Sequence, residues 1–91
     1  MTCPICRKKL RVREWQDDVA GAAVTTERLY ECPEGHYHDH YAYGQTEIMV
    51  GGQQFGWSHR DPEDEVKRIA AQVDTACAGA RAEWRNQRRT G

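Results

Sequence analysis

The residues most able to do chemistry are three cysteines and a set of histidines. Cys3 and Cys6 are separated by two residues, Cys32 follows after 25 intervening residues, and His36 lies four positions later. Two thiols at the spacing of Cys3 and Cys6 can bind one ion from a single tight turn, which Pro4 stiffens. Zinc prefers four tetrahedral nitrogen or sulfur ligands. The pattern therefore predicts one structural zinc ion bound by three thiolates and one imidazole.

The fourth ligand leaves alternatives open. His36 closes a compact second turn, and Gly35 beside it lets the backbone bend toward the metal, so His36 is the preferred choice. His38 and His40 lie just beyond on one face of an expected strand, within reach of the ion. His59 or a water molecule would also complete the ligand set, and these are the less favoured choices.

The remaining cysteine, Cys77, is expected to have a different role. It lies on the apolar stripe of a predicted helix, where a free cysteine is a common small core residue. The alternative for Cys3, Cys6 and Cys32 is that they are ordinary buried or free thiols. Two cysteine-proline turns in one short chain disfavour that alternative.

Strand and turn signals dominate residues 1–58. Apolar, aromatic and β-branched residues predict about four or five short antiparallel strands near 10–15, 24–31, 37–43, 47–50 and 53–57. A loop is expected at 17–21. Gly51 and Gly52 are expected at the turn of a hairpin, because glycine at both central positions permits positive φ angles.

Residues 59–91 are predicted to form one amphipathic helix of roughly 20–27 residues. Asp61 is expected to be its N-cap, and Pro62 suits the first helical position. Apolar residues then recur at steps of three and four from Val66 to Trp84. The fold class is therefore α+β. A small antiparallel sheet at 1–58 is followed by one long C-terminal helix at 59–91, which packs on the sheet or projects from it in one compact unit.

The two cysteine-proline turns resemble the knuckles of zinc-ribbon proteins, in which two such turns meet at one end of a β-hairpin. The resemblance rests on Cys3-Pro4-Ile5-Cys6 and Cys32-Pro33-Glu34-Gly35-His36 and covers residues 1–58. Together with Leu29-Tyr30-Glu31-Cys32, these turns are also similar to the Ogr/Delta family of small phage transcription activators. That family closes its site with a fourth cysteine, whereas this chain has none between 33 and 76. The resemblance implies a regulator of transcription.

Basic residues are concentrated at the two ends of the chain, although the net charge is −1. Residues 80–91 hold four arginines against one glutamate, and residues 1–13 hold no acidic residue. The basic run near the N-terminus is a candidate nucleic-acid contact made of Arg7, Lys8, Lys9, Arg11 and Arg13. The alternative is a solvated strand face, because the chain lacks the domain-wide basic surface of a dedicated nucleic-acid binder.

The helix carries a second candidate surface. Its apolar stripe from Val66 to Trp84 is about 27 Å long, whereas short strands span only ~17–20 Å. The excess lies at Ala80, Arg81, Trp84 and Arg85, and tryptophan and arginine are enriched at binding hot spots. We therefore expect an interface there with a protein partner or a second copy. The alternative is that Trp84 packs back onto the aromatic strand face of its own chain.

Other function classes are disfavoured. Zinc bound by three thiolates is a poor Lewis acid, and the chain has no H-E-x-x-H motif, deaminase motif or phosphate-binding glycine loop. A zinc-dependent hydrolase is thus the weaker alternative, and no small-molecule substrate is expected. The sequence has neither a membrane span of ~20 apolar residues nor a secretory signal, which predicts a cytoplasmic location. We predict a non-enzymatic regulator or adaptor that acts through macromolecular contacts, with protein favoured over DNA as the partner.

Overall fold

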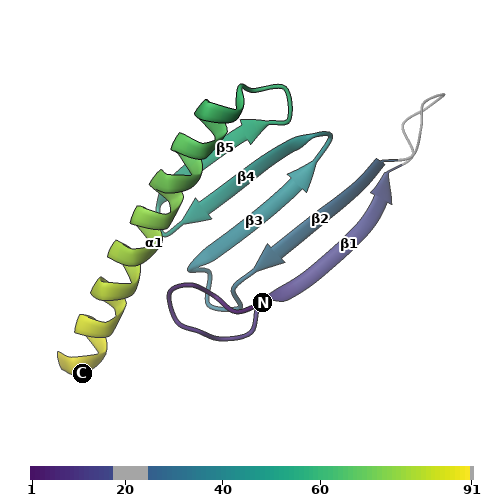
Figure 1. Cartoon of the computed structure of the whole chain (residues 1–91). Helices are drawn as coiled ribbons and strands as arrows, with labels where there is room; N and C mark the ends of the chain where they lie inside the picture. Colours follow the sequence, from purple (N-terminus) through teal and green to yellow (C-terminus); the bar gives the residue numbers. More distant parts are fainter. Residues whose placement is uncertain (18–24, 91) are drawn as a thin grey trace.

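The computed structural model describes residues 1–17 and 25–90, which form one antiparallel sheet and one helix (Figure 1). The five strands lie side by side in sequence order: β1 (Arg11–Asp17), β2 (Thr25–Glu31), β3 (Tyr37–Ala42), β4 (Gln45–Val50) and β5 (Gln53–Ser58). Helix α1 (Glu63–Thr90) follows them. The predicted α+β class is confirmed. Residues 18–21 of the expected loop lie outside the described residues.

Alternation along the strands gives the sheet two different faces. Asp39, Ile48 and Phe55 are register partners across β3, β4 and β5, so their side chains share one face. Helix α1 packs on this face over β4 and β5, where Ile48 and Val50 join Val73 of the helix in the buried core. The helix therefore covers one face of the sheet at its β4 and β5 side.

The core continues from under the helix into the two cysteine-containing turns. Besides Ile48, Val50 and Val73, the buried hydrophobic residues of the described chain are Cys3, Ile5, Cys6, Leu10 and Cys32. On β1 and β3, by contrast, Val12 and Tyr41 keep 55% and 39% of their surface exposed. Much of the small hydrophobic core therefore lies around the cysteines.

The two-residue turns of the last two hairpins compare differently with the sequence expectation. The third strand ends at Ala42, and Tyr43 lies in the turn rather than in the strand. Tyr43 and Gly44 have φ angles of 52° and 75°. A two-residue type I′ turn needs positive φ at both central positions, which explains why the strand stops there. The expected hairpin turn at Gly51 and Gly52 is confirmed, because Val50 pairs with Gln53, and of the two glycines only Gly51 has a left-handed φ, of 60°.

The start of α1 also differs from the prediction by one residue. The Oδ2 atom of Asp61 accepts the N–H of Ser58 at 2.8 Å, and its side chain therefore turns away from the helix. The first helical hydrogen bond runs from the N–H of Val66 to the carbonyl of Pro62, so Pro62 precedes the helix that begins at Glu63. At 28 residues, α1 is slightly longer than expected. Within the described residues, no helix combines the length and the apolar character needed to cross a membrane.

The C-terminal half of α1 extends past the strands and lies beside the N-terminal segment (Figure 1). Ala80 and Trp84 are half-buried and pack against the core. Together with Ile5 and His36 they line a hollow of about 170 Å³. The end of the apolar stripe that extends beyond the sheet thus lies against the N-terminal segment. Trp84 packs within its own chain, and its role in an interface stays a prediction.

Candidate metal centre

The two cysteine-proline turns close through equivalent backbone hydrogen bonds. The N–H of Cys3 donates to the carbonyl of Lys8 at 2.8 Å, and the N–H of Cys32 donates to the carbonyl of Tyr37 at 2.9 Å. Each bond spans five residues and closes a small loop. We call residues 3–8 the first knuckle and residues 32–37 the second knuckle.

Antiparallel pairing brings the knuckles to the same end of the sheet. The first knuckle precedes β1, and the second knuckle joins β2 to β3. Arg11 at the start of β1 pairs with Glu31 at the end of β2. The beginning of one strand therefore lies beside the end of the next, and cysteines far apart in the sequence become neighbours.

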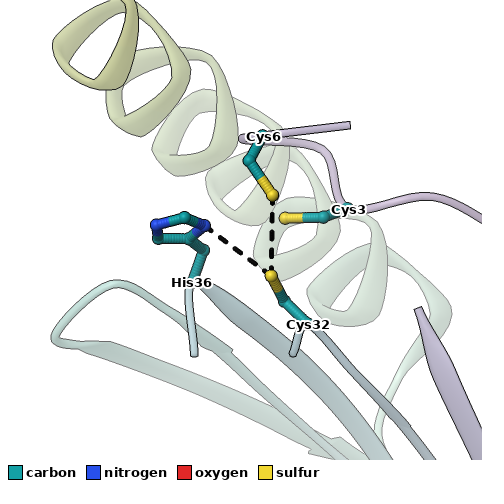
Figure 2. Close-up of side chains that lie close together, drawn as sticks. All are labelled: Cys3, Cys6, Cys32 and His36. Carbon is teal, nitrogen blue, oxygen red and sulfur yellow. Dashed lines mark hydrogen bonds between the residues drawn. The ribbon is translucent and has the colours of Figure 1, made fainter. Parts of the chain in front are cut away.

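Four side chains from the two knuckles point toward one another (Figure 2). The ligand atoms of Cys3, Cys6, Cys32 and His36 all lie within 4.8 Å of one another. The Sγ atoms of Cys6 and Cys32 are 3.6 Å apart, and Nδ1 of His36 is 3.6 Å from Sγ of Cys32. Tetrahedral zinc, with bonds of about 2.3 Å to sulfur and about 2.0 Å to nitrogen, requires separations of about 3.8 Å and about 3.5 Å. The group therefore fits one tetrahedral ion.

Backbone N–H groups surround the thiols. The backbone nitrogen of Ile5 lies 3.4 Å from Sγ of Cys3, and that of Glu34 lies 3.3 Å from Sγ of Cys32. In both knuckles the donor is thus two residues after the cysteine. An N–H that donates to sulfur favours the thiolate, which is the form that binds metal.

The pKa values of the cysteines that begin the two knuckles shift in opposite directions. Burial raises the pKa of Cys3 and outweighs the backbone hydrogen bonds that oppose it. Burial also acts to raise the pKa of Cys32. Hydrogen bonds from the backbone of His36 and Glu34 and from the neighbouring thiols outweigh this effect, and the pKa of Cys32 falls to about 7. Cys32 is therefore partly ionised at neutral pH even before a metal withdraws its proton.

Each knuckle contains one residue with a left-handed backbone. Gly35, directly before His36, has a φ of 79°, as expected for a glycine that bends the chain toward the metal. Arg7, directly after Cys6, has a φ of 67°, although a side chain disfavours this conformation by about 1–2 kcal/mol. The N–H of Arg7 donates to the carbonyl of Cys3 at 3.0 Å. Closing the first knuckle thus requires a strained conformation at Arg7.

The other histidines have partners elsewhere. His38 lies 3.8 Å from a carboxylate oxygen of Glu47, and His40 lies 3.0 Å from one of Glu27, both on the sheet face opposite the helix. His59 has its Nδ1 atom 3.0 Å from a backbone carbonyl at a distant turn. Among the described residues, the cluster of possible metal ligands contains His36 and none of these three histidines.

Cys77 is also separate from the four clustered ligands. It is half-buried on α1 and packs against the hydrophobic core, as predicted from its place on the apolar stripe. Burial is the main cause that raises its pKa. A neutral thiol in this position behaves as a small apolar side chain.

The five basic residues of the predicted nucleic-acid contact lie in or next to the first knuckle and in β1. Three form ion pairs with a glutamate: Lys8, Arg11 and Arg13. The two arginines both reach Glu31 at 3.8 Å, on the sheet face opposite the helix. Arg7 and Lys9 are exposed on or next to the first knuckle. The basic run therefore starts at the first knuckle and continues along β1 on the face opposite the helix.

Arg81 has a role that the sequence does not signal. Its Nη1 atom donates to the backbone carbonyl of Ile5 at 2.8 Å and so joins α1 to the first knuckle. The sequence predicts an interface that contains both Arg81 and Arg85. In the structure Arg85 is exposed, whereas Arg81 is half-buried. The two bonded residues are 76 positions apart. No local pattern predicts such a contact.

Comparisons with known proteins give no match. No protein-family model matches this chain, no curated protein matches its sequence significantly, and no solved structure matches it at the same level. The resemblance to the Ogr/Delta family is thus not supported by a family match. What can be said about function rests on the chemistry of the described residues.

Proposed function

We propose that this chain is a non-enzymatic regulator or adaptor that is built around one structural zinc ion and works by contacting another macromolecule. Cys3, Cys6, Cys32 and His36 would hold the ion. The observation that supports this most directly is that their ligand atoms lie within 4.8 Å of one another, with two separations close to the tetrahedral values.

The donor set favours zinc over other ions. Magnesium and calcium prefer oxygen ligands, whereas thiolates with an imidazole suit zinc and related soft sites. Four protein ligands leave no open position for a water molecule or a substrate, which is what a catalytic zinc needs. A zinc-dependent hydrolase is therefore the less favoured alternative.

A structural ion also fits the way in which this chain is packed. The three clustered cysteines are 0%, 9% and 3% exposed, and they form part of a small core. Domains of fewer than 100 residues bury little apolar surface and often depend on a metal for stability. The ion would join the two knuckles and, through the contact of Ile5 with Arg81, hold the C-terminal half of α1 in place.

Action through macromolecular contact is supported by the exposed surface. Val12 and Tyr41 remain exposed on the part of the sheet that α1 does not cover. On the opposite face, Trp15 is 36% exposed. Protein contact, including contact with a second copy through the C-terminal part of α1, is the favoured mode, and nucleic-acid contact is the alternative. A role in transcription rests on the zinc-ribbon resemblance alone.

Elemental analysis of freshly prepared, reduced protein tests the metal centre. We expect about one zinc per chain, and we expect a chelator to unfold the knuckles, since metal binding and folding are coupled in small metal-dependent domains. Cys32→Ser should lose the ion. Cys77→Ser is the matched control, because it makes the same chemical change outside the cluster, and it should retain the ion. Protein that contains no metal would contradict the proposed centre.

Capture of partners from a lysate, with and without nuclease treatment, tests the mode of action. A partner that survives nuclease treatment indicates direct protein contact. A partner that is lost on nuclease treatment indicates that nucleic acid carries the contact. If neither treatment yields a partner, the proposal of an adaptor is not supported, whatever the zinc content.

A further inference from the structure

The two basic ends of the sequence meet at the metal centre. Arg81 on α1 donates to the carbonyl of Ile5 in the first knuckle at 2.8 Å, and Arg7 follows two residues later in the same knuckle. Figure 1 shows the N-terminal segment beside the C-terminal half of the helix. Charges that lie at opposite ends of the chain therefore belong to one end of the molecule.

The helix presents its cations in a row. Arg81, Arg85 and Arg88 are spaced four and three residues apart, so they lie on one side of α1. The row is about 10 Å long at 1.5 Å per residue. Glu83, the acidic residue within this stretch, is two positions from Arg81 and from Arg85, and residues at that spacing do not face each other on a helix.

Four cations at this end of the molecule take part in no ion pair among the described residues. Among the described residues, Lys8, Arg11, Arg13, Arg28, Lys67 and Arg68 all have a glutamate oxygen within 4 Å. In the same part of the chain, no such ion pair involves Arg7, Arg81, Arg85 or Arg88. Arg88 instead lies over the ring of Trp84, 4.8 Å from the ring centroid. Lys9 and Arg60 are also outside the ion pairs of the described residues, so what distinguishes this end is that several unpaired cations lie together.

The arginines are close enough to influence one another. Burial is the main cause that lowers the pKa of Arg81, and the positive charges of Arg7 and Arg85 lower it further. Like charges that are held together repel, and an anion placed among them relieves that repulsion. The arrangement is therefore suited to an anionic ligand with several closely spaced charges.

We propose that Arg7, Arg81, Arg85 and Arg88 form a composite surface that binds the phosphate backbone of a nucleic acid. This inference rests on the proposed zinc centre, because the ion would hold the first knuckle against the helix. It develops the alternative mode of the proposed function, nucleic-acid contact, and assigns it to a different set of residues from the N-terminal run expected from the sequence. Three of its four arginines come from the helix, and Arg11 and Arg13, which are paired with Glu31, are not part of it.

The chemistry favours nucleic acid over an acidic protein. Guanidinium groups bind phosphate through two parallel hydrogen bonds. Arginines repeated along about 10 Å of one helix side match a linear polyanion, and duplex DNA carries one negative charge per about 1.7 Å of its axis. An acidic protein surface presents carboxylates without this regular spacing. The contact would depend on phosphate and would carry little sequence preference.

Titration of labelled DNA with the zinc-loaded full chain tests the surface. Fluorescence anisotropy is measured with a duplex of about 20 base pairs and with a single strand of equal length, at about 25 mM to 200 mM salt. Four phosphate contacts give a slope of log K against log salt of about −3.6 for the duplex, at about 0.9 per contact. The double variant Arg85→Ala/Arg88→Ala should reduce this slope by about 1.8 and weaken binding at low salt at least tenfold.

The matched control is Lys67→Ala/Arg68→Ala, which removes the same charge from the other end of the same helix, where both side chains are paired with glutamates. It should change the slope by less than about 0.5. Equal losses in the two double variants would show that net charge alone attracts DNA and would overturn the composite surface. Failure to bind either DNA at low salt, or equally tight binding of polyglutamate, would also overturn it.

Zinc content measured on the same samples separates the two proposals. Zinc-loaded protein that binds no DNA contradicts the phosphate surface and leaves the metal centre in place. Wild-type protein without zinc contradicts the metal centre and, with it, the surface that depends on it. Since Arg85 and Arg88 are not ligands, their double variant should retain the metal, and loss of zinc from it would contradict the separation of the two sites.

Discussion

Replacing Gly35 tests the geometry of the second knuckle directly. Gly35 has a φ of 79°, and no atom lies within 4 Å of the position that a Cβ would occupy. Gly35→Ala would therefore meet no steric contact with other residues. Its effect on stability should come from the backbone alone, which makes the magnitude calculable.

The expected loss follows from two opposing terms. A left-handed conformation disfavours an L-residue by about 1–2 kcal/mol. Alanine also restricts the unfolded chain, which offsets about 0.4–1 kcal/mol of that loss. A net loss of about 1 kcal/mol corresponds to about fivefold weaker zinc binding and a melting temperature lower by about 4–8 °C for a chain of this size. Gly35→Asn should lose less, because asparagine tolerates the left-handed region better.

Competition with a chromophoric chelator measures the zinc affinity of each variant, and thermal unfolding of the zinc-loaded protein measures its stability. Gly52→Ala is the control, since Gly52 also has open space around it but no left-handed φ. It should match the wild type within about 0.5 kcal/mol. If Gly35→Ala binds zinc and melts as the wild type does, the bend before His36 is not left-handed, and the ligand geometry derived from it is wrong.

Three further substitutions test other parts of the structure. His36→Ala should weaken zinc binding far more than His38→Ala in the same chelator competition, and the reverse order would move the fourth ligand to β3. Trp84→Ala should lower the unfolding free energy by about 2 kcal/mol, roughly half the value for a fully buried aromatic, because Trp84 is half-buried against the core. Unchanged stability with loss of self-association, seen by light scattering, would instead make it an interface residue. Gly79→Ala should stabilise α1 by about 1 kcal/mol in thermal unfolding, since the site is helical and a Cβ there has open space. A lower melting temperature would place an unseen contact at Gly79.

Local patterns in the sequence were sufficient to predict the elements and the character of the site. The spacing of Cys3 and Cys6 in one turn, repeated in part at Cys32, indicates a metal without knowledge of the fold. Apolar residues that recur every two positions indicated the strands, and those that recur every three or four positions indicated the helix. The recurrence arises because one face of each element is buried along its whole length. These signals are local, and they survive almost any arrangement of the elements in space.

Boundaries were predicted less well, because neighbouring groups compete for the same hydrogen bonds. The side chain of Asp61 accepts the N–H of Ser58 rather than capping the helix, and the helix begins one residue later than expected. Tyr43 follows the alternation of the preceding strand, yet the turn with Gly44 needs its left-handed φ. Several conformations satisfy the local sequence at such points, and the surrounding chain selects one.

The tertiary structure alone decided which side chains share a surface. The pairing of β1 with β2 brings Cys32 and His36 to the first knuckle and leaves Arg11 and Arg13 on the far face. The way in which α1 lies across the sheet brings Arg81 to Ile5. Such contacts join residues tens of positions apart, and their geometry depends on the relative placement of whole elements. Because that placement is set by packing over the entire core, no short segment of the sequence contains it.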